Sequence, residues 1–433
     1  MPPARGLEWK PTLFGLQPRW TEEPQLTAIE AVARSLLGGD EEVRVSFFTQ
    51  GGFNKLYTIE QGTTSYIMRI SLPVDPHRKT ESEVATIQFV QENSKLPVPA
   101  VRYFNSSQSG NALGFEWILM DRIPGFPLSG KWKSMAWSTK EQLVKQVARF
   151  TAGMFRSRFN AIGNLFSRSS GQDDSEVQTE NVQSIRPLGL DPGAEISPSV
   201  TVGQIVSVAF FWGDRLSQDV PRGPFQSSRE WIESRLTITE NESKQTVSTS
   251  DDEDDIEVAE DTIKLVKRLN ILLPRFFPIE QGAGEPEQTM LYHHDLSKEN
   301  ILVTDSGTLA GVVDWESVSV LPLWKACDYP AFLRGKSRDE KPDKEKYHAD
   351  ENGEPGNIYW EHLLEYELTQ LRALFSEVMQ TLEPEWCRLF ESGRAKRDYD
   401  VAVHNCNSEL WFPQIREWLN NIEAGKNGCS LAF

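Results

Sequence analysis

The chain has 433 residues, of which 39% are hydrophobic, which is enough for one large two-lobed domain or two ordinary domains, each with a core. Its formal net charge is −18, and this argues against nucleic acid as a partner, because a phosphate backbone requires a concentrated basic surface. The N-terminus lacks the apolar segment of a secretory signal, and no stretch approaches the ~20 apolar residues of a membrane span. We therefore expect a cytoplasmic protein.

The negative charge is unevenly distributed along the chain. Residues 240–261 contain ten aspartates and glutamates but only one basic residue, Lys244. A run this acidic cannot bury apolar surface, so we expect a solvated, flexible insert at about 240–261. The remaining chain carries an ordinary charge for its size, and charge alone does not select a substrate.

Residues 43–70 predict an antiparallel meander, because apolar and polar residues alternate there in three runs separated by turns. A helix is expected next, beginning with a capping box from Thr80 to Glu83. Two further strands are expected at 100–104 and 116–120, on either side of a polar turn. Together these elements predict a small lobe with one antiparallel sheet and one helix.

From Ser138 onward the apolar residues recur with the period of a helix, behind a second capping box that ends at Glu141. The remainder is expected to be mainly helical, apart from a loose segment at about 167–255. The fold class is therefore α+β with two lobes. We expect a three-part organisation, with an N-terminal extension at 1–42, a nucleotide-binding lobe at 43–123, and a helical lobe for catalysis and substrate binding at 124–433.

Two motifs in the second half of the chain carry the chemistry. The first runs from Tyr292 to Val303 and reads Y-H-H-D-L-S-K-E-N-I-L-V, and the second is G-V-V-D-W-E at 311–316. Phosphoryl transfer requires a carboxylate beside the acceptor hydroxyl and oxygen ligands for magnesium, and Asp295, Asn300 and Asp314 suit these roles. A hairpin formed by residues 301–313 would bring Asn300 and Asp314 together.

The pattern H-x-D-L-x-x-x-N-I-L-V followed by D-W-E resembles the aminoglycoside phosphotransferase and choline kinase superfamily, particularly its fungal members. The resemblance covers roughly residues 43–335 and implies a protein-kinase-like fold. It also implies that Asp295 is the catalytic base or orients the hydroxyl, that Asn300 and Asp314 bind Mg²⁺, and that His293 supports the catalytic loop.

The same resemblance implies a nucleotide site in the small lobe. Arg69 stands where the family has a lysine that grips the nucleotide phosphates, and Glu83 would pair with this cation. Strand alternation places Ile67 on the same face as Arg69. The other residues implied in this site belong to a glycine turn and to the hinge beside the adenine: Gly51, Gly52, Asn54, Met120 and Ile123.

We expect an enzyme that uses ATP, or GTP, with Mg²⁺ to phosphorylate a hydroxyl group of a small molecule. A protein kinase is less well supported, because Ser297 replaces the lysine two positions after Asp295 and no A-P-E element follows Asp314. A pseudokinase-like scaffolding or binding module is the other alternative, suggested by Arg69 and the reduced glycine turn. The complete set of catalytic and metal-binding residues favours the enzyme.

The sequence does not identify the acceptor or decide between a monomer and a weak dimer. Three acids of one predicted helix, Glu361, Glu365 and Glu367, could bind a cationic acceptor if they lined the cleft. We favour the alternative that they form the solvated face of a core helix.

Overall fold

The computed structural model describes residues 5–12, 15–168, 183–184, 200–278, 286–348, 355–426 and 430–431. The chain divides into two compact units, which we describe separately. Unit 1 consists of Met1–Pro124, Ala161–Phe225 and Ala310–Val320, and unit 2 consists of Gly125–Asn160, Gln226–Leu309 and Leu321–Phe433. Two segments that we expected in the helical lobe, at 161–225 and 310–320, thus belong to the unit that contains the sheet.

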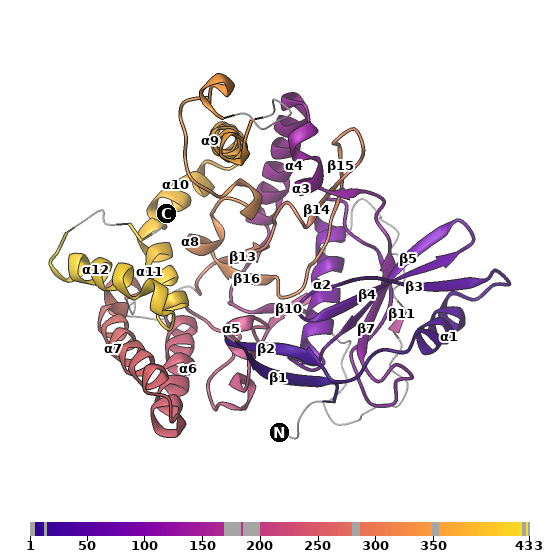
Figure 1. Cartoon of the computed structure of the whole chain (residues 1–433), viewed down its shortest axis with the longest axis horizontal. Coiled ribbons are helices and arrows are strands. Elements are labelled where there is room, and N and C mark those ends of the chain that lie inside the picture. Colours follow the sequence, from indigo (N-terminus) through magenta and orange to yellow (C-terminus); the bar gives the residue numbers. More distant parts are fainter. Residues whose placement is uncertain are drawn as a thin grey trace. The chain divides into compact units, whose positions relative to one another are not determined.

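Unit 1 is built on a six-stranded sheet with the order β11-β6-β7-β5-β4-β3 (Figure 1). Its strands are β3 (Val43–Gln50), β4 (Asn54–Gln61), β5 (Thr64–Ser71), β6 (Val101–Asn105), β7 (Glu116–Asp121) and β11 (Gln183–Ser184). Strands β3, β4 and β5 form the predicted antiparallel meander. Further elements of this unit are β1 (Leu7–Thr12), β2 (Gly15–Trp20), α1 (Leu26–Leu37), α2 (Arg78–Asn93), β10 (Asn164–Ser167), β12 (Val200–Gly203), α5 (Val208–Phe211) and η2 (Arg215–Ser217).

Side-chain alternation along β5 divides its contacts between two helices. Met68 and Ile70 are fully buried in one cluster with Ile29 and Ala33 of α1. The intervening Arg69 instead forms an ion pair with Glu83 of α2. The segment that we predicted as an N-terminal extension therefore contributes helix α1 to the hydrophobic core of this unit.

The predicted capping boxes are wrong, because α2 and α4 both begin without a side-chain cap. Helix α2 begins at Arg78 without a side-chain cap. Thr80 donates to Glu116 Oε2 at 2.6 Å, and Glu83 accepts from Arg69 at 2.8 Å. Helix α4 begins at Trp137, also without a side-chain cap. Tertiary contacts outweighed the local pattern in α2.

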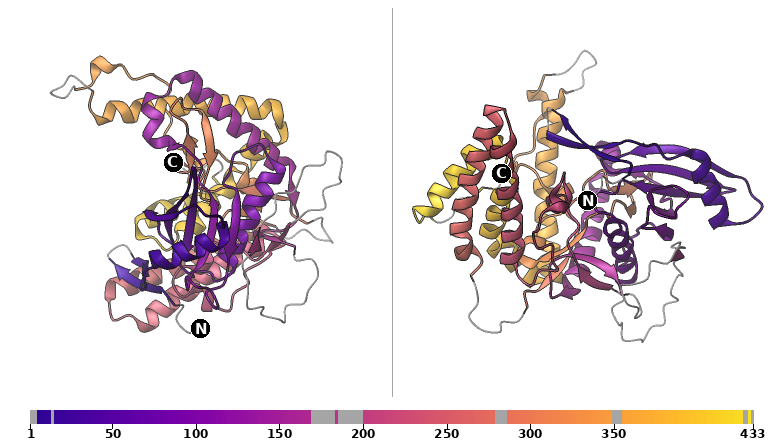
Figure 2. Two further views of the ribbon diagram at one scale, coloured as in Figure 1. Left: turned by 90° about the vertical axis from the view of Figure 1, so that its right-hand side faces the viewer. Right: turned by 90° about the horizontal axis from the view of Figure 1, so that it is seen from below.

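Unit 2 is mainly helical (Figures 1 and 2). Its helices are α3 (Leu128–Lys131), η1 (Trp132–Ser134), α4 (Trp137–Arg156), α6 (Ser228–Thr249), α7 (Glu253–Phe276), α8 (Leu323–Ala326), η3 (Ala331–Leu333), η4 (Lys344–Lys346), α9 (Asn357–Leu382), α10 (Pro384–Ser392), α11 (Arg394–Asn405), η5 (Glu409–Trp411) and α12 (Phe412–Glu423). Helix α4 packs against α9, and α6 packs against α7. Two short strand pairs, β13 (Thr289–Tyr292) with β9 (Arg158–Phe159) and β14 (Ile301–Val303) with β8 (Phe126–Pro127), complete this unit. Strands β15 (Leu309–Val312) and β16 (Ser319–Pro322) lie at the boundaries between units.

The acidic segment at 240–261 is not the loop that we expected. Helix α6 continues to Thr249, and α7 begins at Glu253 after a short link. The Asp252 side chain accepts a hydrogen bond from the Asp254 amide at 3.0 Å, which caps α7. Acidic residues in the first turn of a helix interact favourably with its dipole, so this charge is compatible with a helix N-terminus. The prediction of a loose segment at 167–255 is likewise wrong over 200–203, which form a strand, and over 228–249, which form a helix. Residues 169–182 and 185–199 of that segment lie outside the described residues.

None of the helices in the described part of the chain is both long and apolar enough to span a bilayer.

Candidate active site

The loop after β15 presents Asp314 on an unusual backbone. Asp314 has a φ of 64° and Ser317 a φ of 56°, in the left-handed region that few residues other than glycine adopt. Between them, Trp315 is buried and its indole nitrogen donates to the Val312 carbonyl at 3.0 Å. Aspartate tolerates this conformation better than most side chains. The buried tryptophan anchors the turn that carries Asp314.

Arg69 is the central cation of unit 1. Its Nη1 donates to Glu83 Oε1 at 2.8 Å, so the predicted pair with Glu83 exists. Its Nη2 contacts Asp314 Oδ1 at 3.0 Å and Glu316 Oε2 at 2.8 Å. Arg69 is only 5% exposed, and both of its terminal nitrogens contact carboxylates.

Lys79 and Glu316 belong to the same cluster, and the sequence assigned neither of them a role. Glu316 Oε2 accepts from Lys79 Nζ at 2.7 Å and from Asn54 Nδ2 at 2.9 Å, in addition to Arg69. Lys79 also donates to Asn54 Oδ1 at 2.9 Å, so Asn54 joins strand β4 to helix α2 and to the loop after Asp314. The i,i+4 spacing of Lys79 and Glu83 on one face of α2 was the available signal.

The carboxylates of this cluster respond differently to their burial. Burial raises the pKa of Glu83 to about 7, although Arg69 and Lys79 oppose this shift. Burial also raises the pKa of Asp314, whereas Arg69 lowers it. For Glu316 the desolvation is outweighed by Lys79 and Arg69, which hold its pKa below the usual range. Two cations thus face three carboxylates, and burial disfavours the charged form of both Glu83 and Asp314.

The other predicted nucleotide residues lie in strands or turns of unit 1. Gly51 and Gly52 form the exposed turn between β3 and β4, where the Gly51 amide donates to the Asn54 carbonyl at 2.9 Å. Ile67 of β5 and Met120 of β7 are directly opposite in the sheet, and both are buried. Ile123 follows β7 and lies so close to Gly311 that a β-carbon there would be 2.5 Å from the Ile123 side chain.

The loop that we predicted to be catalytic begins directly after β13 in unit 2. His293 is buried and Asp295 is exposed. Asn300 Nδ2 donates to the Asp295 backbone carbonyl at 2.9 Å and to its Oδ2 at 2.8 Å, so the two predicted functional residues are hydrogen-bonded. The loop is fixed at two further points, because the Leu296 and Lys298 carbonyls accept from the Phe332 and Ser129 amides at 2.9 and 3.1 Å.

The donor set that we expected for magnesium is chemically suitable. The Asn300 amide nitrogen is engaged by Asp295, which leaves its Oδ1 as a ligand, and the Asp314 side chain is 38% exposed. Carboxylate and amide oxygens are ligands that Mg²⁺ prefers. Asp295 and Asn300 belong to unit 2 and Asp314 to unit 1, so their convergence around one nucleotide remains a prediction.

The three acids of α9 are not all a solvated helix face. Glu367 accepts from Lys140 Nζ at 2.8 Å and from the Trp132 indole nitrogen at 2.9 Å. Glu365 pairs with Arg338 at 3.0 Å. Glu365 and Glu367 are therefore neutralised within unit 2 and are not available to a cationic acceptor.

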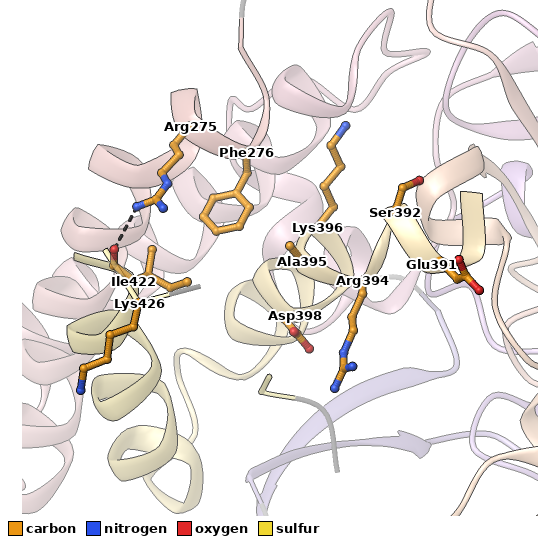
Figure 3. A pocket seen from close by; sticks show the side chains of 10 residues that line it. All are labelled: Arg275, Phe276, Glu391, Ser392, Arg394, Ala395, Lys396, Asp398, Ile422 and Lys426. Atoms are coloured by element: carbon orange, nitrogen blue, oxygen red, sulfur yellow. Dashed lines mark hydrogen bonds between the residues drawn. The ribbon is translucent and has the colours of Figure 1, made fainter. Parts of the chain in front are cut away.

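A separate hollow of about 470 Å³ lies among α7, α10, α11 and α12 (Figure 3). Its lining comprises Arg275, Phe276, Glu391, Ser392, Arg394, Ala395, Lys396, Asp398, Ile422 and Lys426. None of the predicted catalytic, nucleotide or metal residues belongs to this set.

Comparison with known proteins identifies the class. The model of the phosphotransferase enzyme family matches residues 44–325. Because this match covers more than half of the sequence, the chain belongs to the phosphotransferase enzyme family. The predicted superfamily and α+β, protein-kinase-like fold class are thereby confirmed.

Individual relatives share at most about a quarter of their aligned residues with this chain in the three comparisons that follow. A subtelomeric hrmA-associated cluster protein of Aspergillus fumigatus is 27% identical over 323 residues, which cover 66% of this chain and 60% of the relative. The chain therefore spans less than two thirds of that protein. The clavilactone A biosynthesis cluster protein Y of Ampulloclitocybe clavipes is 24% identical over 347 residues, which cover 80% of this chain and 73% of the relative. Among solved structures, the aminoglycoside phosphotransferase APH(4)-Ia in complex with ADP and hygromycin B is 14% identical, with a TM-score of 0.43 and coverage of 93% of this chain and 100% of that chain.

Proposed function

We propose that this protein transfers the γ-phosphoryl group of ATP, with Mg²⁺, to a hydroxyl group of a small molecule. The observation that carries the proposal is the Asp295–Asn300 hydrogen bond, on a loop anchored through Leu296 and Lys298, in a chain that also holds Asp314 against Arg69. GTP is an alternative donor, and the cytoplasm is the proposed location.

The proposed reaction assigns one role to each group. The acceptor hydroxyl oxygen attacks the γ-phosphorus, the bond from this phosphorus to the bridging oxygen of ADP breaks, and the hydroxyl proton passes to Asp295. Asn300 orients Asp295 through its amide nitrogen. Mg²⁺, held by Asn300 and Asp314, would neutralise charge on the phosphate oxygens.

Arg69 has a different role from the one implied by the resemblance. Both of its terminal nitrogens are bound to carboxylates and the side chain is buried, so we propose that it positions Asp314 and does not grip a phosphate. The Gly51–Gly52 turn, Ile67, Met120 and Ile123 are the proposed nucleotide contacts.

A small acceptor is favoured over a protein. Only the eight residues from Glu316 to Leu323 separate the Asp314–Trp315 turn from Trp324, which leaves little chain for a segment that docks a peptide. Phosphate transfer to proteins such as casein, and not to small alcohols, would contradict this assignment.

Two substitutions test the proposed function. We expect Asp314→Ala to abolish Mg²⁺-dependent nucleotide turnover, because a principal metal ligand is removed. Asp295→Ala should lose phosphate transfer while retaining nucleotide binding, since this carboxylate faces the acceptor. Turnover is followed by ADP release and binding by calorimetry. Asp305→Ala, which removes an exposed carboxylate from the turn after β14, is the matched control.

Undiminished turnover in Asp314→Ala would refute the assignment. A scaffolding module, the remaining alternative, predicts no Mg²⁺-dependent turnover in the natural sequence and no difference among the three variants.

A further inference from the structure

The start of unit 2 is strongly basic in an acidic protein. Residues 125–160, which contain α3, η1 and α4, include seven lysines and arginines but one acid, Glu141. Some of these cations are neutralised, since Lys140 pairs with Glu367 and Lys131 with Asp305. The excess nevertheless remains positive, in contrast to the net charge of −18 of the whole chain.

Lys298 brings a further cation to this region from within the catalytic loop. It lies three residues after Asp295, and its Nζ is 4.6 Å from the centre of the Trp132 ring. A second cation near this ring is Lys140, whose Nζ is 4.8 Å from the centre. The Lys298 side chain is partly buried, and among the described residues the Lys298 ammonium has no hydrogen-bond or ion-pair partner.

The nearby acid Glu367 attracts Lys298 only at longer range, because its carboxylate oxygens are already hydrogen-bonded to other residues. Both of its carboxylate oxygens accept from Lys140, at 2.9 and 2.8 Å, and one also accepts from Trp132. Lys133, the residue after Trp132, likewise lacks a carboxylate partner within the described part of the chain, and its Nζ lies 5.2 Å from the Trp360 ring centre. A partly desolvated cation without a carboxylate in direct contact is electrostatically less favourable until an anion binds.

We propose that Lys298 recognises an anionic group of the acceptor, so that the acceptor is a hydroxy acid or another anionic hydroxyl compound and not a polycation. This inference rests on the proposed function and specifies its substrate class. Two observations favour the acceptor over the nucleotide as the source of the anion. The unpaired cations belong to unit 2, in which we place the acceptor, and Lys133, the residue after Trp132, provides a second positive charge over the Trp360 ring.

Binding experiments test the proposal without requiring turnover. We would titrate the full chain with glycerate, with glycerol as its neutral analogue, with choline, and with inorganic phosphate. We expect glycerate to bind more tightly than glycerol or choline. Lys298→Met should weaken glycerate binding by about tenfold or more, and Lys298→Arg should recover part of it.

Lys396→Met is the matched control, because the Lys396 ammonium also lies over an aromatic ring, 5.3 Å from the centre of Phe277, without a carboxylate partner in the described structure. It should bind glycerate as the natural sequence does. Thermal melting of each variant separates a binding defect from loss of the fold.

Turnover with the same acceptors provides the second arm. Lys298→Met should raise KM for glycerate while KM for MgATP stays unchanged. A rise in KM for MgATP alone, with unchanged glycerate binding, would overturn the inference and assign Lys298 to the nucleotide phosphate. Equal binding of glycerate and glycerol, or a preference for choline, would also overturn it. If the natural sequence binds glycerate through Lys298 but shows no Mg²⁺-dependent nucleotide turnover, the proposed function fails while the anion site stands.

Discussion

Replacing Arg69 with methionine should destabilise unit 1 far more than replacing its partner Glu83 with glutamine. Arg69→Met retains a long apolar side chain but leaves Glu83, Asp314 and Glu316 facing one cation, Lys79. Removing one partner of a buried ion pair costs about 3–5 kcal/mol, because the remaining charge stays desolvated. We therefore expect a loss of this size in the free energy of unfolding at pH 8.

The matched substitution Glu83→Gln should cost about 1 kcal/mol or less. It leaves two cations facing two carboxylates, and the glutamine carbonyl can still accept from Arg69. The two substitutions should differ in their effect on the free energy of unfolding because the natural cluster has one carboxylate in excess. Glu83→Gln removes this excess charge from a side chain that is 1% exposed, whereas Arg69→Met increases the excess.

Urea unfolding followed by circular dichroism measures both variants. The defect of Arg69→Met should become smaller at about pH 5.5, where the unpaired carboxylates can take up protons. Equal losses for the two variants, or a loss below about 1 kcal/mol for Arg69→Met, would refute the electrostatic argument.

Two further predictions concern protons and metal. The pKa values of Glu83 and Glu116 are both raised to about 7 by burial, from an ordinary 4.5, so the folded state retains protons that the unfolded state has lost. The free energy of unfolding should therefore decrease as pH rises from 4.5 to 7, and Glu116→Gln should flatten this decrease in urea titrations; a stability that increases over this range would contradict it. ATP should bind at least about tenfold more weakly in EDTA than with Mg²⁺, because the Arg69 cluster has one carboxylate in excess; equal affinities by calorimetry would exclude this explanation.

The local pattern of the sequence was sufficient to predict the strand meander and the loop that carries Asp295 and Asn300. Alternation along 43–70 predicted the meander, and the spacing of Asp295 and Asn300 placed them on one loop, where they are hydrogen-bonded. Both features depend on residues close together in the chain, so short-range periodicity is enough to predict them.

Local patterns failed where distant residues competed for the same side chain. Thr80 and Glu83 have the spacing of a capping box, but Glu116 and Arg69 bind them instead. The acidic segment was assigned to a loop from its composition, although capping by Asp252 and the dipole of α7 stabilise it as a helix start.

The sequence by itself determined the family, the fold class and the identity of the candidate catalytic residues. Only the tertiary structure showed that Lys79 and Glu316 join Arg69, and that Glu367 binds Lys140 while Lys298 has no hydrogen-bonded or ion-paired carboxylate among the described residues. Arg69 and Glu316 are separated by more than 200 residues, and so are Lys140 and Glu367. Which charge neutralises which depends on distances created by folding, and these distances decide whether a cation is structural or is available to a substrate.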